Sequence, residues 1–253
     1  MKTVNVKGVA IGAGKPKIIV PIFGKTKNEI IEKAKGFKGM NIDIVEWRVD
    51  FYDEASNIEK VLSVLKELRT SLKDIPILFT FRTKKEGGEK EITMEEYTKL
   101  NKAVAESGDV ELIDVEIFSG DEVVNENIKN IHQVGGFVVG SNHDFFKTPN
   151  KDEIVSRLRK MQDMGADIPK IAVMPKSIDD VLTLLMATNE MHVKYADRPI
   201  ITMSMGPIGV ISRLSGEVFG SSLTFGAIGQ VSAPGQIPVD ELVNVLDTLH
   251  KSL

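Results

Sequence analysis

The chain has 253 residues, of which 42% are hydrophobic and 27% charged, enough apolar material for one large core under a polar surface. Its formal net charge is -4, so it has no positive field that would attract nucleic acid or an anionic membrane. We therefore do not expect a polyanion as partner.

The sequence contains no cysteine, which excludes disulfides, thiol nucleophiles and cysteine-ligated metal centres. Its first residues, MKTVNVKGVAIGAGKPK, include no uninterrupted apolar stretch of the kind found in secretory signals. No apolar run approaches the roughly 18 residues that a membrane span needs. These features predict a cytoplasmic protein without a membrane segment.

Eight short apolar runs, rich in β-forming residues, alternate with longer segments of helical pattern. The runs are Ile18–Phe23, Ile42–Val49, Ile75–Phe81, Val110–Ile117, Gly136–Asn142, Pro169–Met174, Pro199–Met205 and about Ser222–Ile228. They begin about 30 residues apart, the spacing of successive βα units. The clearest helical segments between them are Ser56–Leu72, Thr93–Ala105 and Asp152–Met164.

Eight βα units in this length predict a closed (β/α)8 TIM barrel, with residues 1–253 forming a single domain. An open, doubly wound sheet has the same local pattern and remains the alternative. No G-x-G-x-x-G turn opens the first helix, and Gly12-Ala13-Gly14-Lys15 precedes a strand, so it is no phosphate loop. We expect Val4–Ile11 to form a hairpin that closes the barrel bottom.

Polar residues stand where the apolar runs end. Side chains alternate between the two faces of a strand, which places Glu46 and Arg48 on one face, and Arg82 ends the next run. Further polar residues end the two runs after that: Asp114, Glu116, Asn142, His143 and Asp144. Catalytic barrels carry their chemistry at the carboxyl ends of the strands. We therefore predict a polar pocket for a small, hydroxylated, anionic ligand.

Each of these residues also has a simpler interpretation. A single arginine at a strand end is usually solvated, and Glu46 with Arg48 could form a structural ion pair. Burying several charges, however, costs several kcal/mol per ion unless they are paired. A barrel without a ligand could fill the same positions with valine or leucine, so the set as a whole favours the pocket.

Lys170 lies near the start of the apolar run Pro169–Met174, where an ammonium is unwelcome. It could extend along the strand edge to water. The alternative is a nucleophile that forms an imine, for which the amine must be uncharged. We expect apolar surroundings and nearby cations such as Arg48 and Arg82 to favour that form.

His143 is the natural general base, because imidazole titrates near neutral pH. The other histidines, at positions 132, 192 and 250, fall in helical segments and are interpreted as surface or packing residues. No ligand spacing predicts a metal site. Arg213 follows the seventh run, where its guanidinium could hold a carboxylate. The stretch Gly229–Pro238 is either an ordinary turn or a lid over the ligand.

Taken together, these segments resemble the type I 3-dehydroquinate dehydratases, which catalyse the third step of the shikimate pathway towards chorismate and the aromatic amino acids. The matching stretches are Glu46-Trp47-Arg48-Val49-Asp50, Thr80-Phe81-Arg82-Thr83 with Glu86-Gly87-Gly88, Ser141-Asn142-His143-Asp144-Phe145, Pro169-Lys170-Ile171-Ala172, Met203-Ser204-Met205-Gly206 with Ser212-Arg213, and Gly229-Gln230-Val231-Ser232-Ala233-Pro234-Gly235-Gln236. They run in family order over nearly the whole chain.

The resemblance implies a lyase that needs no cofactor and no metal, and that is often a homodimer. It implies that Lys170 forms an imine with the substrate ketone, that His143 moves the proton, and that Glu86 orients His143. The substrate-binding residues that it implies are Glu46, Arg48, Arg82, Met203, Met205, Arg213, Phe225, Ser232 and Gln236. One departure is Pro21, where relatives often carry a serine that contacts the substrate.

Two other functions remain open from the sequence. A class I aldolase would use the same lysine, and Arg213 would then hold a phosphate. A non-catalytic barrel that merely binds a hydroxy acid would have no use for an uncharged lysine.

Overall fold

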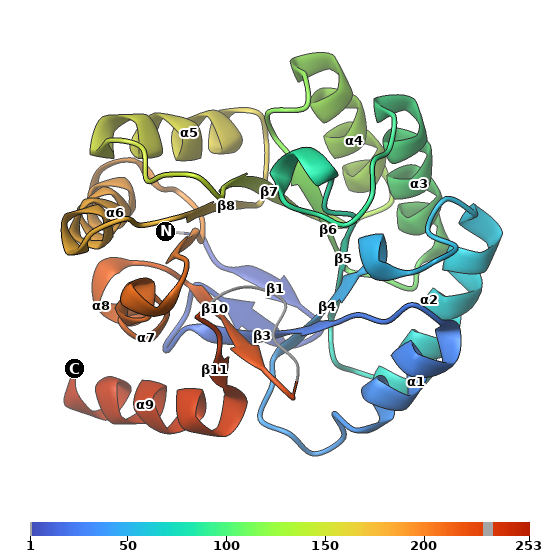
Figure 1. Ribbon diagram of the computed structural model, residues 1–253, viewed down its shortest axis with the longest axis horizontal. Coiled ribbons are helices and arrows are strands. Elements are labelled where there is room, and N and C mark those ends of the chain that lie inside the picture. Colours follow the sequence, from blue (N-terminus) through green and yellow to red (C-terminus); the bar gives the residue numbers. More distant parts are fainter. Residues whose placement is uncertain (1, 230–234) are drawn as a thin grey trace.

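The computed structural model describes residues 2–229 and 235–253. A ring of parallel strands occupies its centre, and helices surround the ring (Figure 1). The strands of the ring are β3 (Lys17–Ile22), β4 (Ile44–Arg48), β5 (Ile77–Thr80), β6 (Leu112–Glu116), β7 (Phe137–Asp144), β8 (Ile168–Val173), β9 (Ile201–Ser204) and β10 (Leu223–Ala227). All eight predicted strands are present, most of them a few residues shorter than expected.

The ring closes between β9 and β10. The strands lie in the order β10-β3-β4-β5-β6-β7-β8-β9. The short β11 (Ile237–Pro238) pairs with the last residues of β10, along the edge opposite β3. A single parallel bridge between Ile200 and Ser221 joins the two ends, and the Ser222 amide donates to the Ile200 carbonyl at 2.8 Å. The closed barrel is therefore confirmed, and the open doubly wound sheet is wrong.

The longer helices pack around the ring. They are α1 (Lys27–Lys35), α2 (Ile58–Leu72), α3 (Met94–Ser107), α4 (Asp121–Gln133), α5 (Lys151–Asp163), α6 (Ile178–Glu190) and α9 (Val239–Ser252). The three helices predicted with bounds start where a side chain caps the first turn: Asn57 for α2, Thr93 with Glu96 for α3, and Asn150 for α5. Such caps satisfy amide groups that have no partner inside the helix.

Short helical turns follow several strands at the carboxyl end of the ring. They are η1 (Val49–Phe51), η2 (Lys84–Glu86), η4 (Pro207–Gly209) and α7 (Ile211–Leu214). Two other short elements lie elsewhere: α8 (Gly216–Phe219) leads into the start of β10, and a π-helical turn, η3 (Met191–Tyr195), extends α6. Loops and short turns at this end of a barrel are where functional side chains usually lie.

Strand alternation separates two apolar cores. The outward side chains, such as Val45 and Trp47, pack with the helices, whereas the inward ones at the amino end of the ring, such as Ile19 and Ile44, form a second cluster. The antiparallel hairpin β1 (Val4–Val6) and β2 (Val9–Ile11) packs into this second cluster. The predicted hairpin is thus confirmed, and the inside of the barrel is apolar at that end.

An exposed apolar strip runs along α6 and the neighbouring turns. Ile178, Leu182 and Met186, spaced one helical turn apart, are each at least half exposed, as is Val218, and Ile208 and Ile211 are nearly so. Within the described residues, no helix has the length and apolar character needed to cross a bilayer.

Candidate active site

A cavity of about 580 Å³ opens at the carboxyl end of the barrel strands. Its lining residues are Glu46, Arg48, Arg82, Glu86, Gly87, His143, Phe145, Lys170, Ala172, Met203, Met205, Arg213, Phe225 and Gln236. All predicted catalytic and substrate-binding residues of the described chain are therefore in one cavity. The remaining one, Ser232, lies outside the described residues. Asp114, Glu116, Asn142 and Asp144, which also led us to predict the pocket, are not among its lining residues.

Lys170 points into the barrel from β8. Its side chain is only 4% exposed, and its Nζ lies 3.4 Å from Glu46 Oε1 and 3.6 Å from Asp114 Oδ2. The same nitrogen lies 4.7 Å above the centre of the Phe225 ring, a cation–π distance. The interpretation in which Lys170 reaches water at the strand edge is wrong, because its amino group ends in the cavity.

The charges beside Lys170 differ from those we expected. We expected Arg48 and Arg82 to favour the uncharged amine, but the groups that contact Nζ include two carboxylates, Glu46 and Asp114. Nearby carboxylates stabilise the ammonium form. The expectation that cations surround the Lys170 amino group is therefore wrong.

His143 and Glu86 come from different strand ends and meet at the cavity wall. His143 lies near the end of β7, and Glu86 ends the turn η2 that follows β5. The imidazole Nδ1 lies 3.0 Å from Glu86 Oε2, a contact that favours the proton on Nδ1 and leaves Nε2 as the basic atom. Burial, helped by the charges of Arg82 and Lys170, holds the pKa of His143 well below its usual 6.5, so the imidazole is neutral.

The Glu86 carboxyl is subject to two opposing influences. Burial, and then the negative charge of Glu116, raises its pKa to about 8. The backbone N–H of His143 at 2.9 Å and Asn142 Nδ2 at 3.1 Å donate to its oxygens, and such donors match the ionised form. Burial and the charge of Glu116 outweigh these donors, so the pKa of about 8 lets Glu86 exchange a proton near neutral pH.

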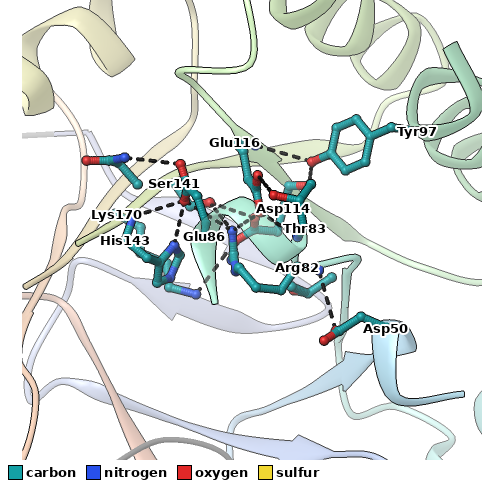
Figure 2. A network of polar contacts seen from close by, with 12 residues as sticks. Asp50, Arg82, Thr83, Glu86, Tyr97, Asp114, Glu116, Ser141, His143 and Lys170 are labelled. Carbon is teal, nitrogen blue, oxygen red and sulfur yellow. Dashed lines mark hydrogen bonds and ion pairs between the residues drawn. The ribbon is translucent and has the colours of Figure 1, made fainter. Parts of the chain in front are cut away.

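Arg82 is the centre of a buried ion-pair network (Figure 2). Its guanidinium lies 2.9 Å from both Asp114 and Glu116, and it donates to Ser141 Oγ at 3.0 Å. Burial opposes its charge, but Asp114 and Glu116 outweigh that effect and raise the pKa of Arg82 well above its usual value. Arg82 therefore stays charged, and its side chain is held in place on the cavity wall.

The structural ion pair that we considered between Glu46 and Arg48 is not the one that forms. Arg48 instead donates to both oxygens of Asp50 at 2.8 Å, in the bidentate geometry that suits a guanidinium. Glu46 accepts a hydrogen bond from Thr80 Oγ1 at 3.0 Å. Each residue is thus held by its own partner while both line the cavity.

Arg213 reaches the cavity from the short helix α7. Its side chain is buried, which lowers its pKa to about 10, still well above neutral pH. Its NH1 lies 3.8 Å from Met203 Sδ, and the Thr224 hydroxyl donates to its backbone carbonyl at 2.8 Å. A buried guanidinium that keeps its charge suits a carboxylate ligand.

Several residues of the site were not predicted from the sequence. Phe145, Ala172 and Gly87 line the cavity, and Ser141 donates a 2.6 Å hydrogen bond to Asp114. Strand alternation could have identified two of them. Ser141 lies two residues before His143 on β7, and Ala172 lies two residues after Lys170 on β8, so each faces inward with its neighbour. Gly87 has φ of +85° and packs against the Phe145 ring, a contact that no sequence pattern signals. Among residues 2–229 and 235–253, no three histidine or carboxylate side chains are arranged to hold a metal ion.

The family described as Type I 3-dehydroquinase matches residues 18–253 of the chain. The 3-dehydroquinate dehydratases of Clostridioides difficile and Bacillus subtilis are 59% and 56% identical to the chain over 252 residues, and each match covers all of this chain and 99% of the relative.

The chain belongs to the type I 3-dehydroquinase family. The crystal structure of the C. difficile type I 3-dehydroquinate dehydratase, solved with covalently modified comenic acid, superposes with a TM-score of 0.98 over 100% of this chain and 99% of that one. Family membership excludes the class I aldolase and the non-catalytic barrel that the sequence had left open.

Proposed function

We propose that the cavity around Lys170, His143 and Arg213 carries out the reaction of the family, with the roles set out below. The chain is a hydro-lyase that converts 3-dehydroquinate to 3-dehydroshikimate and water, the third step of the shikimate pathway. The observation that supports these roles best is that one buried lysine, one neutral imidazole and one buried guanidinium line the same cavity.

The first step is imine formation at Lys170. The ammonium passes a proton to a neighbouring carboxylate, and the free amine attacks the C3 ketone. The carboxyl group then returns that proton to the carbinolamine hydroxyl, which leaves as water, and a protonated imine remains on Nζ. That the C. difficile relative was solved with a covalently modified ligand agrees with a covalent step in this family.

The second step is proton transfer at His143. The protonated imine withdraws electrons, so loss of the C2 proton to Nε2 gives a neutral enamine. Collapse of the enamine expels the C1 hydroxyl, which leaves as water with the proton from His143. Glu86 keeps the ring oriented through Nδ1 during both transfers. Hydrolysis of the product imine returns Lys170 to its starting state.

The other cavity residues bind and orient the substrate. Arg213 holds its carboxylate, and Gln236 and Ser232 close over it. Glu46, Arg48 and Arg82 contact the hydroxyl groups, and the remaining apolar wall consists of Met203, Met205 and Phe225. Fixed orientation of the reacting groups accounts for much of the rate in such reactions. Pro21 lines a different cavity, so a contact with substrate is not expected from it.

Borohydride trapping tests the assignment of Lys170. The protein is mixed with 3-dehydroquinate, reduced with borohydride and digested, and the peptides are mapped by mass. We expect the reduced adduct on Lys170, and we expect Lys170→Ala to show neither adduct nor turnover. An adduct on another residue, or none in a wild-type sample that turns over, contradicts the proposal. A sugar phosphate serves as the substrate control, and it should leave no adduct.

We further infer that the chain forms a homodimer through the strip of Ile178, Leu182 and Met186. These side chains are 50–61% exposed, and the apolar residues Ile208 and Ile211 lie nearby. Apolar strips of this kind favour association, and one helix face can pack against its own copy across a two-fold axis. A homodimer is also what the family resemblance implies.

Light scattering after size exclusion measures the oligomer directly. We expect the wild type to elute as a dimer and Leu182→Glu, which places a charge in the middle of the strip, as a monomer. Asn125→Glu, at an exposed position of α4 away from the strip, introduces the same negative charge and should remain dimeric. A wild-type monomer would refute the inference.

The remaining expectations follow from composition. We propose that residues 1–253 act as one catalytic domain in the cytoplasm, and that nucleic acid is not a partner, because the net charge is -4.

A further inference from the structure

Asp114 lies directly behind the Lys170 amino group. It projects inward from β6, its side chain has no exposed surface, and its Oδ2 is 3.6 Å from Nζ. In the described part of the chain it is not among the residues that line the cavity. A bound substrate therefore meets Lys170 from one side while Asp114 remains on the other.

Asp114 is held in place by two partners. The Arg82 guanidinium lies 2.9 Å from its Oδ2, and the Ser141 hydroxyl donates to its Oδ1 at 2.6 Å (Figure 2). Burial opposes ionisation, but Arg82 and Lys170 outweigh it and keep the pKa of Asp114 below its usual value. The carboxylate therefore keeps both its position and its negative charge.

Glu46 contacts the same nitrogen but differs in position. Its Oε1 lies 3.4 Å from Nζ and accepts a hydrogen bond from Thr80, and its side chain lines the cavity. Glu46 can therefore turn to a substrate hydroxyl, whereas Asp114 has no path to the substrate. Of the two carboxylates, Asp114 is the one that stays beside the nitrogen throughout the reaction.

We propose that Asp114 is a positioning residue for Lys170, the fixed counterion of its nitrogen as ammonium before the reaction and as protonated imine afterwards. This inference rests on the proposed role of Lys170. When ammonium and ketone give protonated imine and water, two N–H protons leave with the ketone oxygen and one positive charge stays on nitrogen. A buried negative charge 3.6 Å away stabilises that charge before and after the step.

Glu116 provides a matched control for Asp114. Both residues lie on the inward face of β6, both are buried, and both pair with Arg82 at 2.9 Å. Among the ion pairs of the described residues, however, Glu116 makes none with Lys170. Asp114→Asn and Glu116→Gln therefore remove the same charge from the Arg82 network, but only the first removes it from the Lys170 nitrogen.

The experiment measures borohydride trapping of 3-dehydroquinate on wild type, Asp114→Asn and Glu116→Gln between about pH 6 and pH 9, with intact mass as readout. In Asp114→Asn we expect the trapped fraction at saturating substrate to fall on the order of 10- to 100-fold. We also expect its pH dependence to move to lower pH, because an ammonium without its carboxylate loses a proton more readily. Glu116→Gln should keep the wild-type pH dependence.

A merely structural role for Asp114 would lower the melting temperature of Asp114→Asn without moving the pH dependence of trapping. A wild-type pH dependence in folded Asp114→Asn therefore overturns the inference. If that variant does not fold, Ser141→Ala replaces it, because this change keeps the charge of Asp114 but removes one hydrogen bond to its carboxylate. We expect Ser141→Ala to shift the pH dependence of trapping less, in the same direction. No shift in Ser141→Ala overturns the inference. If the wild type forms no adduct at Lys170, it is the proposed function that fails.

Discussion

The imidazole Nδ1 of His143 and its backbone N–H both contact one oxygen of Glu86, at 3.0 and 2.9 Å. The strand end of β7 and the turn after β5 are thus joined through both Glu86 oxygens, because Asn142 Nδ2 donates to Oε1 at 3.1 Å. Because the ring is held through both its side chain and its backbone, the orientation of Nε2 towards the cavity is fixed before substrate arrives.

Replacing His143 by alanine separates proton transfer from imine formation. We expect His143→Ala to retain borohydride trapping at Lys170 while kcat falls by about 10²–10⁴-fold, the usual contribution of a general base. Steady-state kinetics and peptide mass mapping on the same sample measure the two quantities. Wild-type turnover in this variant would remove His143 from the proposed role.

The pH dependence of kcat/KM reports the state of His143. Its pKa lies well below 6.5 because of burial and then the charges of Arg82 and Lys170, so the imidazole is already neutral at pH 6.5. As the pH falls, the base is lost only when the pH passes through this lowered pKa. We therefore expect no acid limb down to pH 6.5. Because Glu86 has a pKa of about 8, the test is made in Glu86→Gln, where an acid limb at or above pH 6.5 would contradict the lowered pKa of His143.

Glu86 links pH to stability with a definite sign. Its folded pKa of about 8 exceeds the ordinary 4.5, so the folded state binds this proton more tightly than the unfolded state. The stabilisation is complete below 4.5 and is lost as the pH rises to about 8. Glu86→Gln cannot titrate at this position. Its melting temperature minus that of wild type should therefore increase from pH 4.5 to about pH 8 and stay constant above that pH. A constant difference between the two melting curves would show that Glu86 titrates normally.

Substituting Arg213 tests the carboxylate anchor. Lysine keeps the charge but loses the two-pronged geometry, so we expect Arg213→Lys to raise KM about 10- to 100-fold with a smaller change in kcat. Arg198→Lys, at an arginine that pairs with Asp197 and does not line the cavity, is the matched control and should leave KM unchanged. A KM unchanged in Arg213→Lys would place the anchor elsewhere.

The turn that carries Glu86 has no room for a methyl group. A Cβ on Gly88 would lie 1.9 Å from the backbone oxygen of Arg82, so the turn or the strand end must move. We expect Gly88→Ala to lower the free energy of unfolding by about 1–3 kcal/mol and to reduce kcat, because Arg82 and Glu86 shift with it. Urea denaturation measures the first effect. Gly36→Ala is the control, because Gly36 has φ of -68° and its added methyl would meet only Lys33 O at 3.2 Å.

Sequence patterns predicted those parts of the protein that depend on local periodicity. Two-residue alternation in β4 placed Glu46 and Arg48 on the inner face, and the apolar run around Lys170 marked it as unusual. The repeat of βα units predicted the barrel, and the caps at Asn57 and Thr93 explain why the predicted helices begin close to where they do.

Contacts between distant strands were not predictable from such patterns. Asp114 and Lys170 are on β6 and β8, which are not neighbours in the sheet, and only the curvature of the closed ring brings them within 3.6 Å. For that reason we expected cations beside Lys170 and found carboxylates. Glu86 lies in a turn without periodicity, so only the family resemblance pointed to it.

The ring of strands closes at the junction between β9 and β10. An isolated bridge between Ile200 and Ser221 joins the segments just before β9 and β10, and the chain between those strands contains α7. Within it Ser212 Oγ accepts from the Ser204 amide of β9, and the carbonyl of Arg213 accepts from Thr224 of β10. The segment that contains Arg213, the proposed carboxylate anchor, therefore also connects β9 to β10. We expect ligand binding at Arg213 to stabilise this junction, where the ring closes.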